Sequence, residues 1–151
     1  MNMLSSRFAI ATILCAVLAA GCDESLETVA GPTPALTPTL SSIQRDIFHA
    51  SDSSGRPSCA SCHNPNGGAF RAVGLDLSTD GTHASLVGVA SRQKPGVLRV
   101  APGDPANSYL IQKIEGHADI VGTRMPQRGP FLSDGQVAII KRWIELGAKN
   151  D

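Results

Sequence analysis

Two cysteines and a histidine stand close together in the run Cys59-Ala60-Ser61-Cys62-His63. Two thiols three residues apart can each add to one of the two vinyl groups on a porphyrin edge, and the histidine that follows then lies under the iron as its proximal ligand. The run fits the motif for covalent attachment of a c-type haem at every fixed position. It predicts one haem bound through Cys59 and Cys62, with its iron on His63.

A C-x-x-C pair also occurs in thioredoxin-type redox sites, in structural disulfides and in zinc sites. A thioredoxin-type site would need a βαβ pattern around the cysteines, and a closed zinc site would need a second pair of ligands. The sequence beyond the first 22 residues indicates neither. Covalent haem is therefore the preferred interpretation, and a haem-free module in which Cys59 and Cys62 form a disulfide is an alternative.

Met125 is the only methionine beyond the first three residues of the chain. Pro126 follows it and disfavours a helix at position 125, so we expect a loop that can present the sulfur to the iron. A thioether is a familiar haem ligand, and Met125 is therefore the preferred sixth ligand. Bis-histidine ligation would give a lower reduction potential. The competing histidines, with the main rival first, are His117, His83 and His49.

Three arginines are candidates for binding the haem propionates, because a guanidinium can grip a carboxylate through two hydrogen bonds. They are Arg99, Arg124 and Arg128, and each can equally be a solvated surface residue. The stretch Asn-Pro-Asn-Gly-Gly at 64–68 predicts a tight turn after His63, since glycine permits a positive φ and asparagine tolerates it.

The first 21 residues have the pattern of a bacterial signal peptide, with Arg7 before an apolar stretch at 8–20. That stretch is too short for a comfortable membrane span. It closes with Leu-Ala-Ala-Gly-Cys, which resembles the lipobox of bacterial lipoproteins, where cleavage leaves a lipid-modified cysteine. We therefore expect export and lipidation at Cys22; an ordinary secretory signal is the alternative. Asp23 then resembles a signal for retention at the inner rather than the outer membrane.

Residues 22–40 are expected to form a lipidated N-terminus and a tether rich in proline and threonine. The segment has few apolar residues and three prolines, so no stable helix or strand is predicted there. An extended tether spans about 3 Å per residue, which would hold a folded domain away from a bilayer. Such a reach suits docking to redox partner proteins of the cell envelope.

Residues 41–151 are expected to form one small all-α domain of short helices and long loops, because strand signals are weak. Ser41 or Ser42 can cap a helix that runs to Ala50. Asp104 and Pro105 suit the N-cap and first position of a second helix, which stops before Gly116. A helical turn is expected around 83–87.

The last helix has the strongest sequence signals. Ser133 and Gln136 form a capping box, and Gly147 stops the helix. Apolar residues on its inner face recur at helical spacing, as expected for a helix packed on a core. They are Val137, Ile140, Trp143 and Ile144.

Composition narrows the function classes. The formal net charge is zero, so no excess of positive charge points to nucleic acid. Aromatic residues make up only 4% of the chain, which leaves a thin core for a domain of this size. A buried cofactor would compensate for that deficit.

The domain from about Ser42 to Ala148 resembles the class I cytochrome c family, particularly its bacterial domains of planctomycete type. The order of several motifs carries this resemblance. They are Cys59-Ala60-Ser61-Cys62-His63, Pro102-Gly103-Asp104-Pro105 with Ser108-Tyr109-Leu110, Arg124-Met125-Pro126, and Leu132-Ser133 leading into Trp143-Ile144-Glu145-Leu146-Gly147-Ala148.

The resemblance implies a small cytochrome c-like fold around one covalent haem and an electron carrier rather than an enzyme. It also implies that the N- and C-terminal helices cross beside the haem, with Phe48 and Trp143 as the candidate aromatic contact. With His63 and Met125 on the iron, no substrate would bind there. The alternatives are a haem sensor or haem enzyme with an open sixth site, and a haem-carrying subunit of a larger membrane oxidoreductase.

Overall fold

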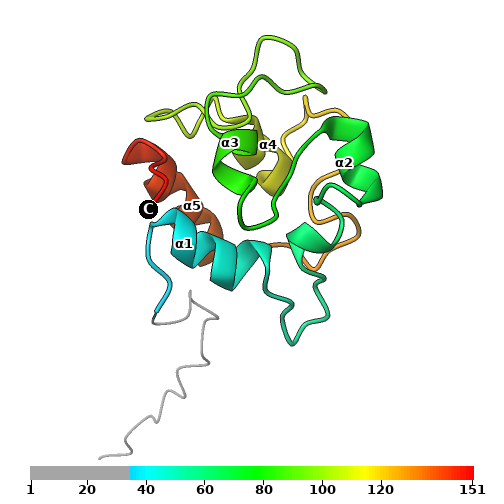
Figure 1. Cartoon of the computed structure of the whole chain (residues 1–151), viewed down its shortest axis with the longest axis vertical. Helices are drawn as coiled ribbons and strands as arrows, with labels where there is room; N and C mark the ends of the chain where they lie inside the picture. Colours follow the sequence, from blue (N-terminus) through cyan, green and yellow to red (C-terminus); the bar gives the residue numbers. More distant parts are fainter. Residues whose placement is uncertain (1–34) are drawn as a thin grey trace, which may run out of the picture.

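The computed structural model describes residues 35–151 (Figure 1). The predicted signal peptide at 1–21, the lipidation site Cys22 and most of the predicted tether at 22–40 lie outside the described residues. Within 35–151, no helix is long and apolar enough to cross a membrane.

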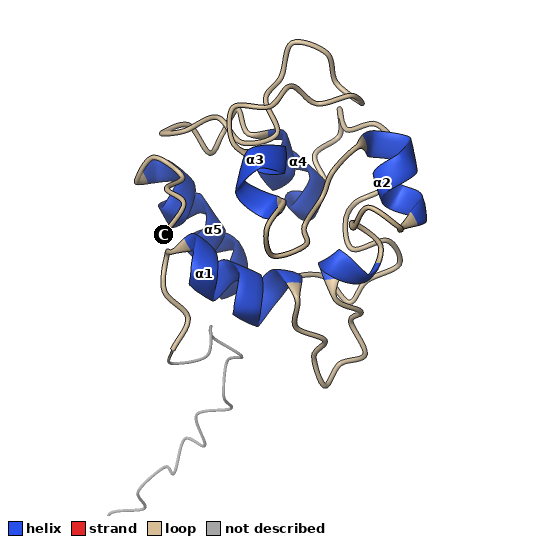
Figure 2. Ribbon diagram, viewed as in Figure 1, coloured by secondary structure: helices blue, strands red, loops and turns tan. Residues whose placement is uncertain are grey.

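The described part of the chain is helical, as predicted, and contains no β-strand, only three isolated bridges in the loops (Figure 2). Helices hold 36% of these residues, so loops make up most of the domain. The elements are α1 (Leu40–Ile43), the π-helix η1 (Gln44–Phe48), the 3₁₀-helix η2 (Cys59–Ser61), α2 (Gly68–Val73), α3 (Thr82–Leu86), α4 (Tyr109–Glu115) and α5 (Asp134–Glu145).

The first helix begins earlier than predicted. Its N-cap is Thr39, whose hydroxyl accepts a hydrogen bond from the backbone of Ser42, so the serines expected to cap it lie inside the helix. Asp151 explains why this start is stable: its carboxylate accepts from the Leu40 N–H at 2.9 Å, and its backbone carbonyl accepts from the Ser41 N–H at 2.9 Å. The helix then continues as η1 and ends at Phe48.

Helix α5 confirms the capping box predicted at its start. The Ser133 hydroxyl accepts from the Gln136 backbone, and the Gln136 side chain accepts from the Ser133 backbone. The four apolar residues predicted on its inner face are all buried. Trp143, which is 1% exposed, also donates its indole N–H to the Lys149 carbonyl at 2.9 Å. Helices α1 and α4 both pack against α5, and this face lies in the core.

The prediction that Asp104 caps the next helix is wrong. The Asp104 carboxylate instead accepts hydrogen bonds from the backbone and side chain of Asn107, which closes a separate turn. Ser108 is the N-cap of α4, and its hydroxyl bonds to the Asp104 carbonyl and the Ala101 N–H. The chain therefore turns once more before the helix starts at Tyr109. Gly116, with φ 77°, ends α4 as expected.

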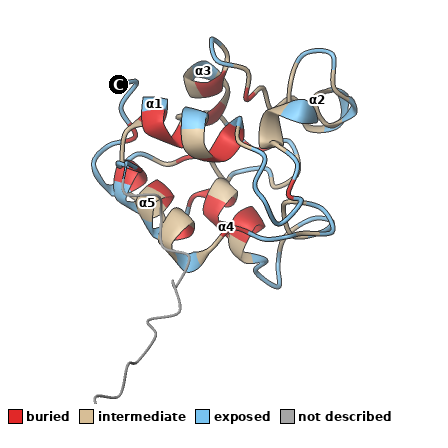
Figure 3. Cartoon of the chain, turned by 90° about the horizontal axis from the view of Figure 1, so that it is seen from below, coloured by how far each residue is buried: buried red, intermediate tan, exposed pale blue. Residues whose placement is uncertain are grey.

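Helix α3 confirms the helical turn expected near 83–87, whereas α2 was not predicted. No residue of α2 is buried, and its N-cap makes no side-chain hydrogen bond, so neither an apolar stripe nor a capping signal marks it (Figure 3). The turn before it forms as predicted, with the Gly67 N–H donating to the Asn64 carbonyl at 2.7 Å. Gly67 has an ordinary φ of −78°, but a Cβ there would lie 2.1 Å from the Cys62 carbonyl oxygen. Space, rather than backbone angle, requires glycine at this position.

Candidate functional site

A cavity of about 690 Å³ contains the four residues that the sequence marks for haem chemistry. Cys59, Cys62 and His63 line it from one segment, and Met125 lines it from a loop more than sixty residues further along the chain. Helices α2 and α4 complete its walls, and α2 lies at the opposite side of the molecule from α5 (Figure 1). Much of the lining is apolar, including Phe48, Leu75, Leu77, Leu86, Leu110, Ile114 and Leu132.

The cysteine segment is held in a short 3₁₀ turn. Ser58 caps it, and the Cys59 carbonyl accepts from the N–H groups of Cys62 at 3.2 Å and His63 at 3.0 Å. This turn brings both cysteines and the histidine onto the cavity wall. Both cysteines are free thiols; Cys59 is half-buried and Cys62 is exposed.

Arg56 lies behind this segment and is 1% exposed. Its guanidinium pairs with Asp52 at 2.8 Å and approaches the Ile47 carbonyl of η1 at 3.5 Å. The Cys59 thiol lies 3.9 Å from the same carbonyl. Burial raises the pKa of Cys59, and the charge of Arg56 opposes that rise. Arg56 thus joins the end of the first helix to the start of the cysteine segment.

The surroundings of His63 favour its neutral imidazole, which is the form that binds a metal. Burial lowers its pKa most, and the positive charges of Arg99 and Lys113 lower it further, against a smaller opposing effect of the Leu75 backbone. Its Nδ1 is buried and makes no hydrogen bond. The backbone fixes the residue, since the Leu77 N–H donates to the His63 carbonyl at 2.8 Å.

The Met125 loop is fastened to α4 by several hydrogen bonds. The Met125 N–H donates to the Lys113 carbonyl at 2.9 Å. The preceding residue, Arg124, donates from its side-chain Nε to the Ile114 carbonyl at 2.7 Å. The Tyr109 hydroxyl accepts from the Val121 N–H at 3.0 Å. Met125 is in a loop, as predicted, and these bonds keep it at the cavity wall.

Four cationic side chains and no carboxylate occur among the described residues that line the cavity: Arg92, Arg99, Lys113 and Arg128. Arg99 is 8% exposed, and its guanidinium donates to the carbonyls of Ser85 at 2.6 Å and Val73 at 2.7 Å. Burial and then the nearby charge of Arg92 lower the pKa of Arg99. Like charges brought together at a partly buried wall cost free energy that a bound anion would offset.

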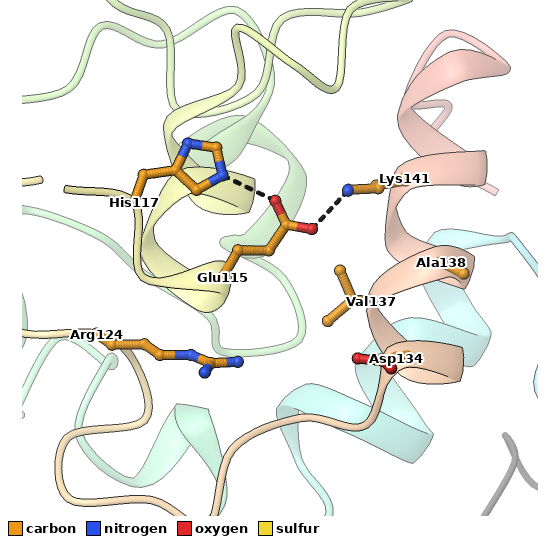
Figure 4. A pocket seen from close by; sticks show the side chains of 7 residues that line it. All are labelled: Glu115, His117, Arg124, Asp134, Val137, Ala138 and Lys141. Atoms are coloured by element: carbon orange, nitrogen blue, oxygen red, sulfur yellow. Dashed lines mark hydrogen bonds and ion pairs between the residues drawn. The ribbon is translucent and has the colours of Figure 1, made fainter. Parts of the chain in front are cut away.

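Arg124 does not line this cavity, so the structure removes it from the propionate candidates and keeps Arg99 and Arg128. It points into a separate pocket with Glu115, His117 and Lys141 (Figure 4). Its guanidinium lies 4.0 Å from the centre of the Phe131 ring. This cation–π contact and the bond to Ile114 hold it away from the cysteine segment.

The three histidines considered as rivals to Met125 also lie outside the cavity lining. His117 bonds to Glu115 at 2.9 Å, and Glu115 also pairs with Lys141 at 2.5 Å (Figure 4). His49 and His83 bond through Nε2 to the carbonyls of Leu77 and Ala148. Of the four candidates for the sixth ligand, Met125 alone reaches the cavity.

Two cationic residues of the lining, Arg92 and Lys113, were not predicted from the sequence. Arg92 lies in a loop that carries no signal for a buried role. Lys113 stands one helical turn after Tyr109, on the face of α4 that carries buried residues, and this spacing was the available signal.

No group of three or more histidine, cysteine, aspartate or glutamate side chains that could hold a metal ion occurs within residues 35–151. Comparisons of the chain with protein-family models, curated proteins and solved structures found no match. The residues that line the cavity therefore provide the indication of what it binds.

Proposed function

We propose that this chain is a monohaem c-type cytochrome that transfers electrons in the bacterial cell envelope. One haem is bound covalently through Cys59 and Cys62, and its iron is ligated by His63 and Met125. The observation that carries the proposal is the convergence of these four residues on one cavity of about 690 Å³. The proposed fold is correspondingly a small cytochrome c-like domain.

The cavity lining suits a group that is mostly apolar and carries negative charge. Its volume is typical of small-molecule and cofactor sites. Apolar side chains cover most of the wall, whereas Arg92, Arg99 and Arg128 supply positive charge without any lining carboxylate. Haem has an apolar macrocycle and two propionates, so we assign the propionates to this group of arginines.

Each site residue has a distinct role in the proposed function. Bound haem supplies one-electron exchange at its iron. Burial and nearby cations lower the pKa of His63, which favours the neutral imidazole that would bind as the proximal ligand. Met125 provides the thioether on a loop fixed to α4. With both residues as ligands, the iron would have no open position for a substrate, so the chain would act as a carrier rather than an enzyme.

Placement in the envelope is part of the same proposal and is supported by the sequence alone. The leader pattern and Cys22 favour a chain exported to the periplasmic side and anchored by lipid, in the inner rather than the outer membrane. Its partners would be other redox proteins of the envelope. Cys22→Ser should release the chain from the membrane fraction; continued extraction only with detergent would contradict the anchor.

The test is expression of the full chain in a host that matures c-type cytochromes. A denaturing gel should show haem that stays with the chain, and visible spectra should show a low-spin iron with the weak red band of a ferric iron–sulfur bond. Met125→Ala should keep the covalent haem and lose the red band, whereas the control His117→Ala should keep both.

Three results would change the proposal in different ways. A chain without covalent haem after export would favour the disulfide-bearing module. If the unmodified chain instead shows a high-spin ferric spectrum and lacks the red band, a haem sensor or haem enzyme with an open sixth site would be favoured. Haem that is reduced only within an isolated membrane complex would instead identify a subunit of a larger oxidoreductase.

A further inference from the structure

Lys113 is a buried cation whose role is not explained by haem attachment or ligation. It is 8% exposed on α4 and lines the cavity together with His63 and Met125. Its ammonium group donates to two backbone carbonyls of the Met125 loop, at 2.8 Å to Val121 and 2.6 Å to Thr123. Its own backbone carbonyl accepts the Met125 N–H at 2.9 Å. Lys113 therefore holds this loop at both ends of the segment 121–125.

A buried ammonium is a costly way to hold a loop. Removal of a charge from water is unfavourable unless strong partners replace the lost hydration, and two neutral carbonyls replace it only in part. No salt bridge to a carboxylate is formed by Lys113 within the described residues. A residue such as methionine would fill the same space at lower cost, so the charge itself calls for an explanation.

Lys94 shows what an ordinary lysine does on the same part of the fold. Its side chain is 25% exposed and forms a salt bridge with Asp119. It also donates to the Gln112 side chain of α4 at 3.1 Å. Lys94 thus also joins α4 to the loop that follows it, but a carboxylate neutralises its charge and it does not line the cavity. The two lysines form a natural matched pair.

We propose that Lys113 is a positioning residue that holds the Met125 sulfur in place over the iron and sets a positive charge beside the haem that favours the reduced state. This inference rests on the proposed function. Reduction adds one negative charge to the haem, and an uncompensated cation in a wall of low polarity attracts that charge more strongly than a solvated one does. The two roles share one side chain, because Lys113 lines the cavity while its ammonium bonds to the loop.

The experiment uses the haem-loaded chain and three variants. Lys113→Met keeps a long unbranched side chain, one atom shorter, but removes the charge and the bonds to the loop. Its covalent haem should remain, its red iron–sulfur band should weaken, and its equilibrium constant for reduction should fall about tenfold, a shift of about 59 mV for one electron. Lys113→Arg, which keeps a charge and donors, should restore both. Lys94→Met should change neither.

A Lys113→Met protein with unchanged potential and unchanged red band would overturn the inference, even if its thermal stability fell. If that variant does not fold, Lys113→Gln serves in its place, since it keeps a donor for one carbonyl but has no charge. It should keep the band and still lower the potential; an unchanged potential would again overturn the charge effect. Failure of the proposed function would be seen separately, as absence of covalent haem from the unmodified chain.

Discussion

Two regions of this domain are built in different ways. Helices α1 and α5, with the part of α4 that packs on α5, form a closed region, in which buried apolar side chains meet and Asp151 bonds to the start of α1. The other region contains the cysteine segment, α2, the Met125 loop and the side of α4 that lines the cavity. Helix α2 has no buried residue, whereas α5 buries four (Figure 3).

The difference indicates that scaffold and ligand site depend on different interactions. The apolar surface of the closed region is already covered by other side chains of the domain, so it needs no ligand to cover it. The cavity region leaves apolar walls uncovered and cations without a carboxylate partner among the described residues, so a group bound there would stabilise it. Substitutions in the two regions should therefore respond differently to haem loading.

The largest contrast is expected between Ile140→Ala and Leu110→Ala. Ile140 is fully buried in the closed region, and its truncation should lower the free energy of unfolding by about 2–5 kcal/mol with or without haem. Leu110 is half-buried at the cavity wall, so its truncation should cost only about 1 kcal/mol in the haem-free chain and more in the loaded one. Urea denaturation measures both. Equal losses in the haem-free chain would contradict the division into two regions.

A smaller effect is expected at the boundary between the regions, where Arg56 pairs with Asp52. Asp52→Asn would leave the buried guanidinium without its charge partner and should lower the free energy of unfolding by about 1–2 kcal/mol. The expected loss is modest because Asp52 itself is partly exposed to solvent. Arg56→Met at the same site should cost less, since it removes the buried charge itself. A larger loss for Arg56→Met would indicate that the guanidinium acts through packing.

The same carboxylate gives a pH dependence. Hydrogen bonds from Ser54 and then Arg56 hold the pKa of Asp52 well below its ordinary value. A carboxyl group whose pKa is lower in the folded state stabilises the protein above its unfolded pKa of about 3.9 and loses that contribution as the pH falls toward the folded value. The free energy of unfolding of Asp52→Asn should therefore fall less steeply below about pH 4 than that of the unmodified chain. An equally steep fall in both proteins would contradict this assignment.

The smallest effect is expected at Asp151, within the closed region. Asp151→Ala removes the acceptor for the Leu40 N–H and should cost about 1 kcal/mol, which is typical of a lost helix cap. Asp151→Asn keeps a side-chain oxygen in place and should cost less. Thermal unfolding of the haem-loaded and haem-free chains should show the same difference for each variant, because this contact is remote from the cavity.

Prediction from sequence succeeded where local signals and packing agreed. The capping box and the apolar face of α5 are both local patterns, and both are confirmed. The start of α1 was missed because Thr39 and two serines are equally good caps by type, and Asp151 decides among them from more than one hundred residues away. The start of α4 was missed because Asp104 uses its carboxylate within its own turn.

The candidate site was predicted unevenly for the same reason. The cysteine motif is contiguous, so Cys59, Cys62 and His63 could be grouped without any knowledge of the fold. Arg124 and Arg128 stand close in sequence and could not be separated, although only Arg128 lines the cavity. The cations Arg92 and Lys113 reach it through tertiary contacts that no short motif records.

Gly67 has a consequence for how this sequence can vary over evolution. Glycines such as Gly55 and Gly88 have positive φ angles but open space around them, so asparagine, which tolerates such angles, can replace them at moderate cost. At Gly67 any side chain would collide with the Cys62 carbonyl, although its φ is ordinary. In homologues that keep the turn after the cysteine pair, position 67 should remain glycine. The residue types at positions 55 and 88 should vary more.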